Sequence, residues 1–291
     1  MATEVLTLEQ LTTPESHPAP ALVSGGALAP ATAQRPRIDF GGTLIDHVDR
    51  HQALDRIRSF LHAGQPQQVV TVNLDFLSIA ERDARFRAVI NGAGLAVADG
   101  MPLVWLSRLR GEPLAERVAG VDLVDAACAL AARTGDGVFL LGAAPGVAQA
   151  AAERLVERHP GLRIAGTYSP PMGPLKRKQN QQIVRMIREA APGFLFVALG
   201  APRQDVWIAE HLHELNVPVA MGVGCVFDLL AGVATRAPHW MQATGLEWSW
   251  RLLREPRRLW RRYILNDLPV FGRLLLSGRR SDGQQPIVVP T

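Results

Sequence analysis

The sequence has little cysteine, almost no lysine and no long hydrophobic run. Cys128 and Cys225 lie far apart among apolar residues, which argues against a disulfide framework or a zinc site and indicates a reducing cytosol. No apolar run reaches the roughly 18 residues that a membrane-spanning helix needs. Glu4 and Glu9 occupy the place of a basic signal-peptide region, and no apolar core follows them. These absences predict a cytoplasmic protein without a transmembrane anchor.

Several catalytic motifs are missing as well. The chain has no DxD sequence and no cluster of His, Cys and carboxylate residues with metal-ligand spacing. We therefore expect no bound metal and no other cofactor. GxGxxG, P-loop and GxSxG patterns are also absent, which disfavours a Rossmann dinucleotide site, an ATPase and a hydrolase of the GxSxG type.

The net positive charge of the chain comes from one end. The whole chain holds 31 Lys plus Arg against 27 Asp plus Glu, and only Lys176 and Lys178 are lysines. Residues 246–291 contain nine Arg and four acidic residues, so the remainder is about neutral. Guanidinium groups stay charged and suit phosphate recognition. The body lacks a basic stripe with stacking aromatics, so we expect no nucleic-acid partner.

Short apolar runs alternate with helical patterns from Ile38 onward. The predicted strands are 68–72, 95–98, 137–141, 163–166, 194–199 and 217–221. Helices are predicted after most of them, among them 76–80, 147–158 and 206–215. Near-continuous apolar strands that alternate with helices are typical of a parallel sheet covered on both faces. We predict an α/β fold with a doubly wound, mostly parallel, Rossmann-like sheet.

Composition divides the chain into three parts. Residues 1–37 are rich in Ala, Pro, Ser and Gly, and we expect a flexible leader because such a segment buries little apolar surface. Residues 38–245 form the predicted α/β domain, and residues 246–291 form a helical, Arg-rich appendage.

Four arginines of the appendage have the spacing of one helical face: Arg257, Arg258, Arg261 and Arg262. The opposite face is predicted to be apolar and aromatic: Leu259, Trp260, Tyr263 and Ile264. A helix of this kind suits an anionic membrane surface. A helix packed on the core with a solvated Arg face is the alternative.

Polar residues and glycines follow five of the predicted strands. Ligands of open parallel sheets lie outside the carboxyl ends of the strands, so we expect these residues along one edge. They are Thr71, Asn73, Asp99, Gly100, Gly142, Gly146, Gly200, Arg203, Gln204, Gly222 and Gly224.

Most of these residues have a structural interpretation beside a functional one. Asp99 fits the N-cap of the next helix as well as a general base. Thr71 and Asn73 suit sugar hydroxyls or turn chemistry. The glycine turn 142–146 fits a phosphate or close packing. Arg203 could bind phosphate and Gln204 a sugar or base, or both could lie on an exposed helix face.

Seven segments, in order, resemble glycosyltransferases of the WecG/TagA/CpsF family, glycosyltransferase family 26. They are TVNLDFL, VADGMPLVW, ERVAGVDL, FLLGAAPG, ALGAPRQDVWI, GVGCVFDLLAG and RAPHWMQATGLEWSWRLLREPRRLWRRY. The resemblance covers about 38–263. It implies transfer of a hexose from a UDP-sugar to a polyprenyl-diphosphate-linked sugar, with inversion and without a metal, in the synthesis of exopolysaccharide or another cell-surface polysaccharide.

The resemblance also implies roles for individual residues. Asp99 matches the catalytic base, Thr71 and Asn73 match residues near it, and Arg117 and Gln204 match residues implicated in activity. The Arg-rich end would dock on the inner face of the plasma membrane and close over the site. Its candidates for holding a diphosphate are Arg254, Arg258, Arg261 and Arg262. An oligomer is compatible with the sequence.

The donor sugar depends on a weaker resemblance. Residues 167–178 (TYSPPMGPLKRK) differ from the loop of many members and resemble the xanthan-type subgroup, which adds glucose to a lipid-linked glucose. UDP-glucose is thus slightly favoured over UDP-N-acetylmannosamine or its uronic acid. The alternatives are a nucleotide-binding α/β oxidoreductase, which the missing GxGxxG disfavours, and a non-catalytic scaffold that binds membranes or nucleic acid.

Overall fold

The computed structural model describes residues 36–171 and 173–278, apart from the side chains of His239, Ala243 and Arg258. Its central sheet has six strands: β3 (Gln67–Val72), β4 (Leu95–Ala98), β5 (Gly137–Gly142), β6 (Arg163–Tyr168), β7 (Phe194–Ala198) and β8 (Val219–Gly222). Their spatial order is β4-β3-β8-β7-β5-β6, and all neighbours are parallel. The predicted parallel α/β sheet is confirmed.

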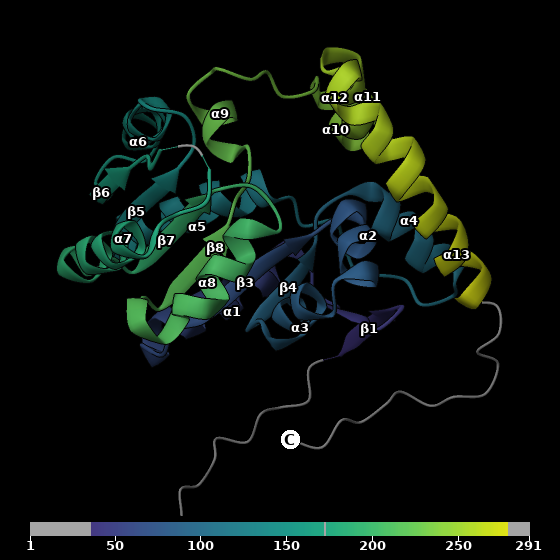
Figure 1. Cartoon of the computed structure of the whole chain (residues 1–291), viewed down its shortest axis with the longest axis horizontal. Coiled ribbons are helices and arrows are strands. Elements are labelled where there is room, and N and C mark those ends of the chain that lie inside the picture. Colours follow the sequence, from purple (N-terminus) through teal and green to yellow (C-terminus); the bar gives the residue numbers. More distant parts are fainter. Residues whose placement is uncertain (1–35, 172, 279–291) are drawn as a thin grey trace, which may run out of the picture. The chain divides into compact units, whose positions relative to one another are not determined.

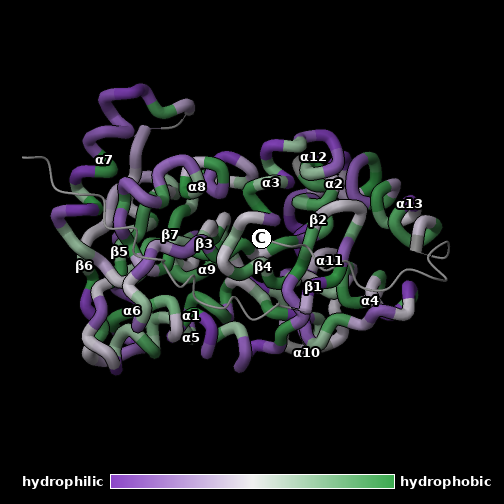
Figure 2. The backbone as a smooth tube through the Cα atoms, turned by 90° about the horizontal axis from the view of Figure 1, so that it is seen from below, coloured by the Kyte–Doolittle hydropathy of each residue, from purple (hydrophilic) through white to green (hydrophobic). Residues whose placement is uncertain are grey.

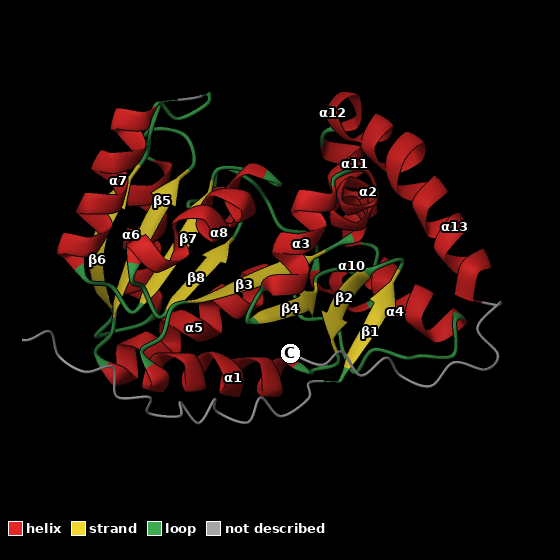
Figure 3. Cartoon of the chain, turned by 60° about the horizontal axis from the view of Figure 1, so that its bottom comes forward, coloured by secondary structure: helices red, strands yellow, loops and turns green. Residues whose placement is uncertain are grey.

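Helices cover both faces of this sheet (Figure 3). One apolar cluster joins the sheet to α1 (Arg50–Ala63), α5 (Gly120–Thr134), α6 (Val147–Arg158) and α9 (Val226–Leu230). On the other face, α7 (Arg177–Ala190) and α8 (Arg203–Leu215) pack on β5 and β7. Figure 2 shows the apolar strands β5 and β7 beside a largely hydrophilic α7. The strands are buried on both sides, which explains their continuous apolar sequences.

A third cluster lies at the β4 edge. Here β3 and β4 pack against α2 (Leu74–Arg82), α3 (Ala84–Gly92) and α4 (Met101–Leu109). A hairpin of β1 (Arg37–Phe40) and β2 (Thr43–Asp46) contributes Phe40 and Ile45 to the same cluster. Of the predicted leader, only Pro36 and Arg37 are described, and Arg37 already belongs to β1.

The hairpin and α1 escape sequence prediction for physical reasons. The hairpin strands have four residues each and include Arg37, Asp39 and Asp46, so they show no apolar run. Helix α1 buries only Ala53 and Ile57. The signal that could have located α1 is its capping box, in which Asp49 and Gln52 exchange hydrogen bonds.

The C-terminal segment forms α10 (His239–Ala243), α11 (Glu247–Arg254), α12 (Pro256–Trp260), η1 (Arg261–Asp267) and α13 (Leu268–Gly278). Its last helices pack on α2 and α4 (Figure 1). Val270 and Leu274 of α13 are buried in the third cluster, so this part of the appendage packs on the body. No helix within the described ranges has the length and apolar character needed to cross a bilayer.

The two predicted faces of the appendage are only partly observed. Segment η1 is π-helical, and the Leu268 N–H donates to the carbonyl of Tyr263, five residues back. The wider turn rotates later side chains away from the positions that an α-helical period assigns. Arg262, on the predicted Arg face, pairs with Asp75, while Trp260 and Ile264 of the predicted apolar face are 40% and 52% exposed.

Candidate active site

Two neighbouring strands deliver Asn73 and Asp99 to the same place. Val72 pairs with Ala98 at the ends of β3 and β4. Asn73 directly follows Val72, and Asp99 directly follows Ala98. The Asp99 N–H donates to the Val72 carbonyl at 2.7 Å, which fixes both backbones. Asn73 caps α2, because its Oδ1 accepts from the Phe76 N–H at 3.1 Å. Its amide nitrogen is left to donate elsewhere.

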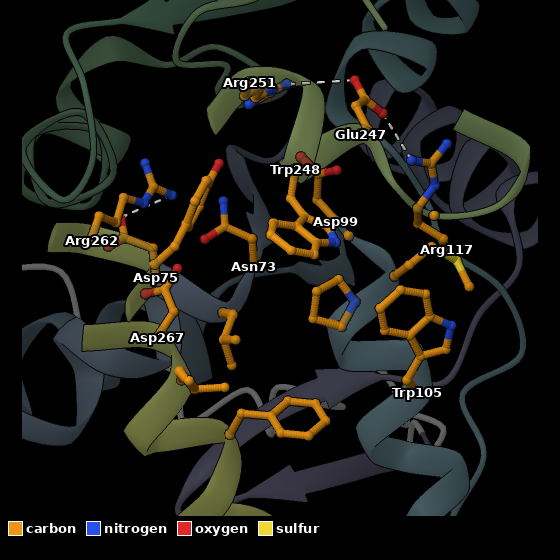
Figure 4. Close-up of a pocket in the computed structure, with 18 residues that line it drawn as sticks. Asn73, Asp75, Asp99, Trp105, Arg117, Glu247, Trp248, Arg251, Arg262 and Asp267 are labelled. Carbon is orange, nitrogen blue, oxygen red and sulfur yellow. Dashed lines mark hydrogen bonds and ion pairs between the residues drawn. The ribbon is translucent and has the colours of Figure 1, made fainter. Parts of the chain in front are cut away.

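A cavity of about 300 Å³ opens at this point (Figure 4). Its walls come from the loops after β3 and β4, from the loop before α5 and from the C-terminal helices. The lining residues are Asn73, Leu74, Asp75, Asp99, Gly100, Met101, Pro102, Trp105, Arg117, Gly245, Glu247, Trp248, Arg251, Arg262, Tyr263, Asp267, Leu268 and Phe271. The cavity unites five predicted residues, Asn73, Asp99, Gly100, Arg117 and Arg262.

Asp99 is not the cap of the helix that follows it. The N-cap of α4 is Gly100, at φ 128°, and no side chain completes the cap. The Asp99 carboxyl instead meets the backbone N–H of Gly120, the first residue of α5. Burial raises the pKa of Asp99 above its ordinary 3.8, while the Arg251 guanidinium opposes the shift. A partly desolvated carboxylate in a cavity suits a general base.

Glu247 connects the appendage to the loop that carries Arg117. Its Oε2 lies 3.0 Å from Arg117, and its Oε1 lies 3.7 Å from both Arg236 and Arg251. The Arg236 guanidinium also reaches Asp122 of α5 at 2.6 Å and 3.0 Å. This network holds α11 beside Asp99. Arg117 and Arg251, which both act on the Asp99 carboxyl, are therefore already paired with Glu247.

A second polar group lies on the other side of Asn73 (Figure 4). Asp75, in the first turn of α2, forms an ion pair with Arg262 of η1 at 3.1 Å. Asp267, at the end of η1, is only 5% exposed. Burial and the neighbouring Asp75 raise the pKa of Asp267 to about 7, against the opposing effect of Arg262. Burial also raises the pKa of Asp75.

We expect Asp267 to make stability depend on pH. Its pKa is raised in the folded state, so its favourable contribution is complete below about pH 3.8 and is lost as pH rises through about 7. The free energy of unfolding of the wild type, relative to Asp267→Asn, should therefore fall across this range. Urea unfolding of both proteins at several pH values measures this difference, and a pH-independent difference would contradict it. The pKa of Asp205 is also raised to about 7, but Asp205 is present in both proteins, so its contribution to the pH dependence cancels in the difference.

Aromatic side chains form much of the remaining wall. Trp105 of α4 and Trp248 of α11 face the cavity, and Trp248 packs edge-on against Tyr263 with ring centroids 6.1 Å apart. Phe271 of α13 completes this surface. Apolar walls with a few convergent polar groups are typical of small-molecule sites. A sugar ring, with an apolar face and hydroxyls at its edge, matches this arrangement.

The predicted residues Thr71 and Gln204 do not line the cavity. Thr71 is 7% exposed, and it lies beside Asp99 where both approach Gly120. Gln204 is 2% exposed, and its Oε1 accepts from the N–H groups of Gly200 and Gly224. It thereby joins the loops after β7 and β8. Those two N–H groups point to Gln204 and are not presented to a phosphate.

The other predicted glycines lie at the ends of β5 and β8. A side chain at Gly142 would reach within 2.4 Å of the Ala198 carbonyl oxygen, and one at Gly222 within 2.5 Å of Asp205. Both positions therefore require glycine for packing. Gly146 is the N-cap of α6 and faces open space. Arg203 donates to the carbonyl of Gly173 at 2.6 Å.

Two of the four arginines predicted to hold a diphosphate, Arg254 and Arg261, lie outside the cavity lining. Arg254 is exposed and stacks on Trp250 at 4.9 Å from the ring centroid. Arg261 is exposed and lies 5.4 Å from the centroid of Trp260. The side chain of Arg258 falls outside the described part of the chain. Across the described residues, no group of three His, Cys, Asp or Glu could hold a metal ion.

Comparison with known proteins identifies the family. The model of the family described as "Glycosyl transferase WecG/TagA/CpsF family" matches residues 38–284. The chain belongs to this family. It is a glycosyltransferase, and the resemblance seen in the seven sequence segments is confirmed.

Curated relatives of this glycosyltransferase include proteins of Staphylococcus aureus. Those of strains MW2 and NCTC 8325 / PS 47 are each 30% identical to it over 247 residues. The matches cover 84% of this chain and 94% of each relative. Both are named N-acetylglucosaminyldiphosphoundecaprenol N-acetyl-beta-D-mannosaminyltransferase.

Sequence reasoning missed several side chains of the glycosyltransferase cavity. They are Asp75, Trp105, Glu247, Trp248, Arg251 and Asp267. Glu247 and Arg251 carried a usable signal, because they are four residues apart on one helix face and lie within the family's C-terminal segment. Asp267 lies four residues after Tyr263, a spacing that places both on one helix face, but no motif around it marks its carboxylate as part of a cavity.

Proposed function

We propose that the protein transfers an N-acetylated hexose from a UDP-sugar to a polyprenyl-diphosphate-linked sugar, in cell-surface polysaccharide synthesis. The observation that carries this proposal is the Asp99 carboxyl in an aromatic cavity that also holds Asn73 and Arg117. The names of the S. aureus relatives favour UDP-N-acetylmannosamine as donor. They give no support to the glucosyl transfer that residues 167–178 suggest.

In the proposed reaction, the acceptor sugar occupies the cavity and presents one hydroxyl to Asp99. The carboxylate takes the proton of that hydroxyl as its oxygen forms a bond to the anomeric carbon of the donor. The bond from that carbon to the diphosphate oxygen breaks, and UDP leaves with the electron pair. Attack opposite to the leaving group inverts the configuration. The amide nitrogen of Asn73 can donate to a neighbouring hydroxyl and orient the ring.

The charge of the departing UDP needs donors outside this cavity. Arg117 and Arg251 contact Glu247, and Arg262 contacts Asp75, so the guanidinium groups of the lining are largely neutralised. We propose that the turn before α6 receives a donor phosphate at Gly146, the N-cap of α6, where no side chain caps the helix and no atom lies within 4 Å of an added Cβ. Exposed Arg254 and Arg261 remain candidates for the acceptor diphosphate.

A transfer assay tests the function. The full-length protein is incubated with UDP-N-acetylmannosamine, UDP-N-acetylglucosamine or UDP-glucose and with a short-chain polyprenyl-diphosphate-linked N-acetylglucosamine. We expect UDP release that requires the acceptor and is fastest with UDP-N-acetylmannosamine. Release that is independent of the acceptor, or absent with every donor, would refute the proposal. Fastest release with UDP-glucose would restore the glucosyl assignment.

We also propose that the appendage rests on the anionic inner face of the plasma membrane. Five exposed apolar side chains lie along 260–276, and the first, second and fourth are four residues apart: Trp260, Ile264, Leu265, Leu268 and Leu276. Leu253 of α11 is 75% exposed, and Arg257 and Arg261 are exposed nearby in sequence. An apolar helix face flanked by arginine is typical of interfacial helices.

Membrane binding should depend on this apolar face. Replacing Leu253, Ile264 and Leu268 together with Ser should weaken binding to phosphatidylglycerol vesicles by about 100-fold or more, because each buried apolar side chain contributes about 1 kcal/mol or more. Flotation of protein with vesicles measures the effect. Val156→Ser on α6, whose side chain is 41% exposed, is the matched control. Equal binding by the triple variant and the wild type would contradict the assignment.

A further inference from the structure

The group formed by Asp75, Arg262 and Asp267 has more polar capacity than its internal contacts use. Arg262 reaches Asp75 at 3.1 Å, which explains how η1 is held on α2. Asp267 lines the same cavity, is only 5% exposed, and its Oδ1 has no hydrogen-bond partner among the described residues. The Nε of Arg262 is likewise buried without a partner there. Holding η1 in place therefore does not account for Asp267.

A buried polar atom without a partner is unfavourable, so an occupant that bonds to it is favoured. A carboxylate oxygen requires a donor, and a guanidinium N–H requires an acceptor. A hydroxyl group provides both functions. Two adjacent hydroxyls of a sugar can each donate to one of the two carboxyls, and either can accept from Arg262.

The charges around the cavity argue against an acidic occupant. Four carboxyl groups line it, those of Asp75, Asp99, Glu247 and Asp267, against the three guanidinium groups of Arg117, Arg251 and Arg262. Each of these arginines contacts Asp75 or Glu247. A carboxylate brought into this space would meet other carboxylates and no uncompensated cation.

We propose that Asp75, Arg262 and Asp267 form the subsite that binds two hydroxyl groups of an uncharged acceptor sugar and excludes sugars that carry a carboxylate. The proposal rests on the function proposed above, in which the acceptor hydroxyl meets Asp99. Figure 4 shows Asn73 between Asp75 and Asp99, so a ring above Asn73 can reach both ends of the cavity. Trp105 and Trp248 provide its apolar walls.

Binding measured without turnover tests this subsite. Trp105 and Trp248 line the cavity, so occupation should change the tryptophan fluorescence of the full-length protein. The probes are a short-chain polyprenyl diphosphate linked to N-acetylglucosamine and the same lipid linked to glucuronic acid. We call the N-acetylglucosamine lipid the neutral probe, because its sugar is uncharged. We expect the wild type to bind it at least about 10-fold more tightly than the glucuronic acid lipid, which is the effect of losing one hydrogen bond to a charged group.

Two isosteric variants locate the effect. Asp267→Asn should weaken binding of the neutral probe by about 10-fold, because the uncharged amide oxygen of Asn accepts a sugar hydroxyl more weakly than a carboxylate oxygen does. Asp75→Asn should remove most of the preference, because it weakens the neutral probe and leaves Arg262 available to a carboxylate. Asp55→Asn is the matched control, since its side chain is 65% exposed and paired with Arg58 on α1. Thermal unfolding checks that each variant is folded.

The outcomes separate this proposal from the proposed function. Equal affinity of the wild type for the two probes, binding of neither probe, or unchanged preference in both cavity variants would overturn the subsite. Selective binding without transfer from any donor would support the subsite and refute the function. The two wild-type affinities decide the matter even where a variant does not fold.

Discussion

Asp99→Asn should lower the transfer rate constant by about 10²- to 10⁴-fold, which is the contribution of a general base. Asparagine has nearly the same shape and can still accept a hydrogen bond, but it cannot take the proton of the acceptor hydroxyl. The KM values for donor and acceptor should change little. The fold should also be preserved, because Gly100 and not Asp99 is the N-cap of α4. Acceptor-dependent UDP release under saturating substrates measures the loss.

Stability and pH provide separate readouts of the same residue. Burial raises the pKa of Asp99, so its ionised form is disfavoured in the folded protein, and Asp99→Asn should be at least as stable as the wild type near neutral pH. The wild-type rate should fall as pH drops through that raised pKa, because the base must be deprotonated. The residual rate of the variant should lack this limb. Asp55→Asn should behave as wild type, and retained turnover in Asp99→Asn would remove Asp99 as the base.

The sheet and one half of the site follow from rules that act locally along the chain. Apolar strands followed by helices predict the parallel sheet, and the helix Val147–Arg158 is predicted with its observed bounds. Because parallel strands end at one edge, Asn73 and Asp99 could be placed together before β3 and β4 were known to be neighbours. The distinction between cap and base at Asp99 could not be drawn, because it depends on the direction of one side chain.

The other half of the site depends on contacts between distant segments. Arg117 and Glu247 are 130 residues apart in the chain, and no pattern in either segment indicates their ion pair. Gln204 was predicted near substrate because an amide suits a sugar. The structure occupies its Oε1 with the N–H groups of Gly200 and Gly224, which meet it only once β7 and β8 are adjacent. Arg262 pairs with Asp75 of α2, and no pattern near either residue indicates this contact.

The same distinction between packing and ligand binding can be measured at two predicted phosphate-binding glycines. Gly142→Ala should destabilise the protein by about 3–5 kcal/mol, combining backbone strain with overpacking. Gly142 has φ +111°, and a Cβ there would lie 2.4 Å from the Ala198 carbonyl oxygen. That oxygen also accepts from the Ala143 N–H at 2.9 Å, so neither backbone can move without breaking a hydrogen bond between the end of β5 and β7.

Gly146→Ala is the matched control, because Gly146 and Gly142 both have a positive φ but differ in the atoms that surround them. Gly146 has φ +83°, and no atom lies within 4 Å of an added Cβ, so only the conformational cost of about 1 kcal/mol is expected. Chemical unfolding compares the two variants. Equal stability would show that the Gly142 contact does not constrain the fold. If Gly146 approaches a donor phosphate, its variant should instead raise the KM for the UDP-sugar while remaining nearly as stable as the wild type.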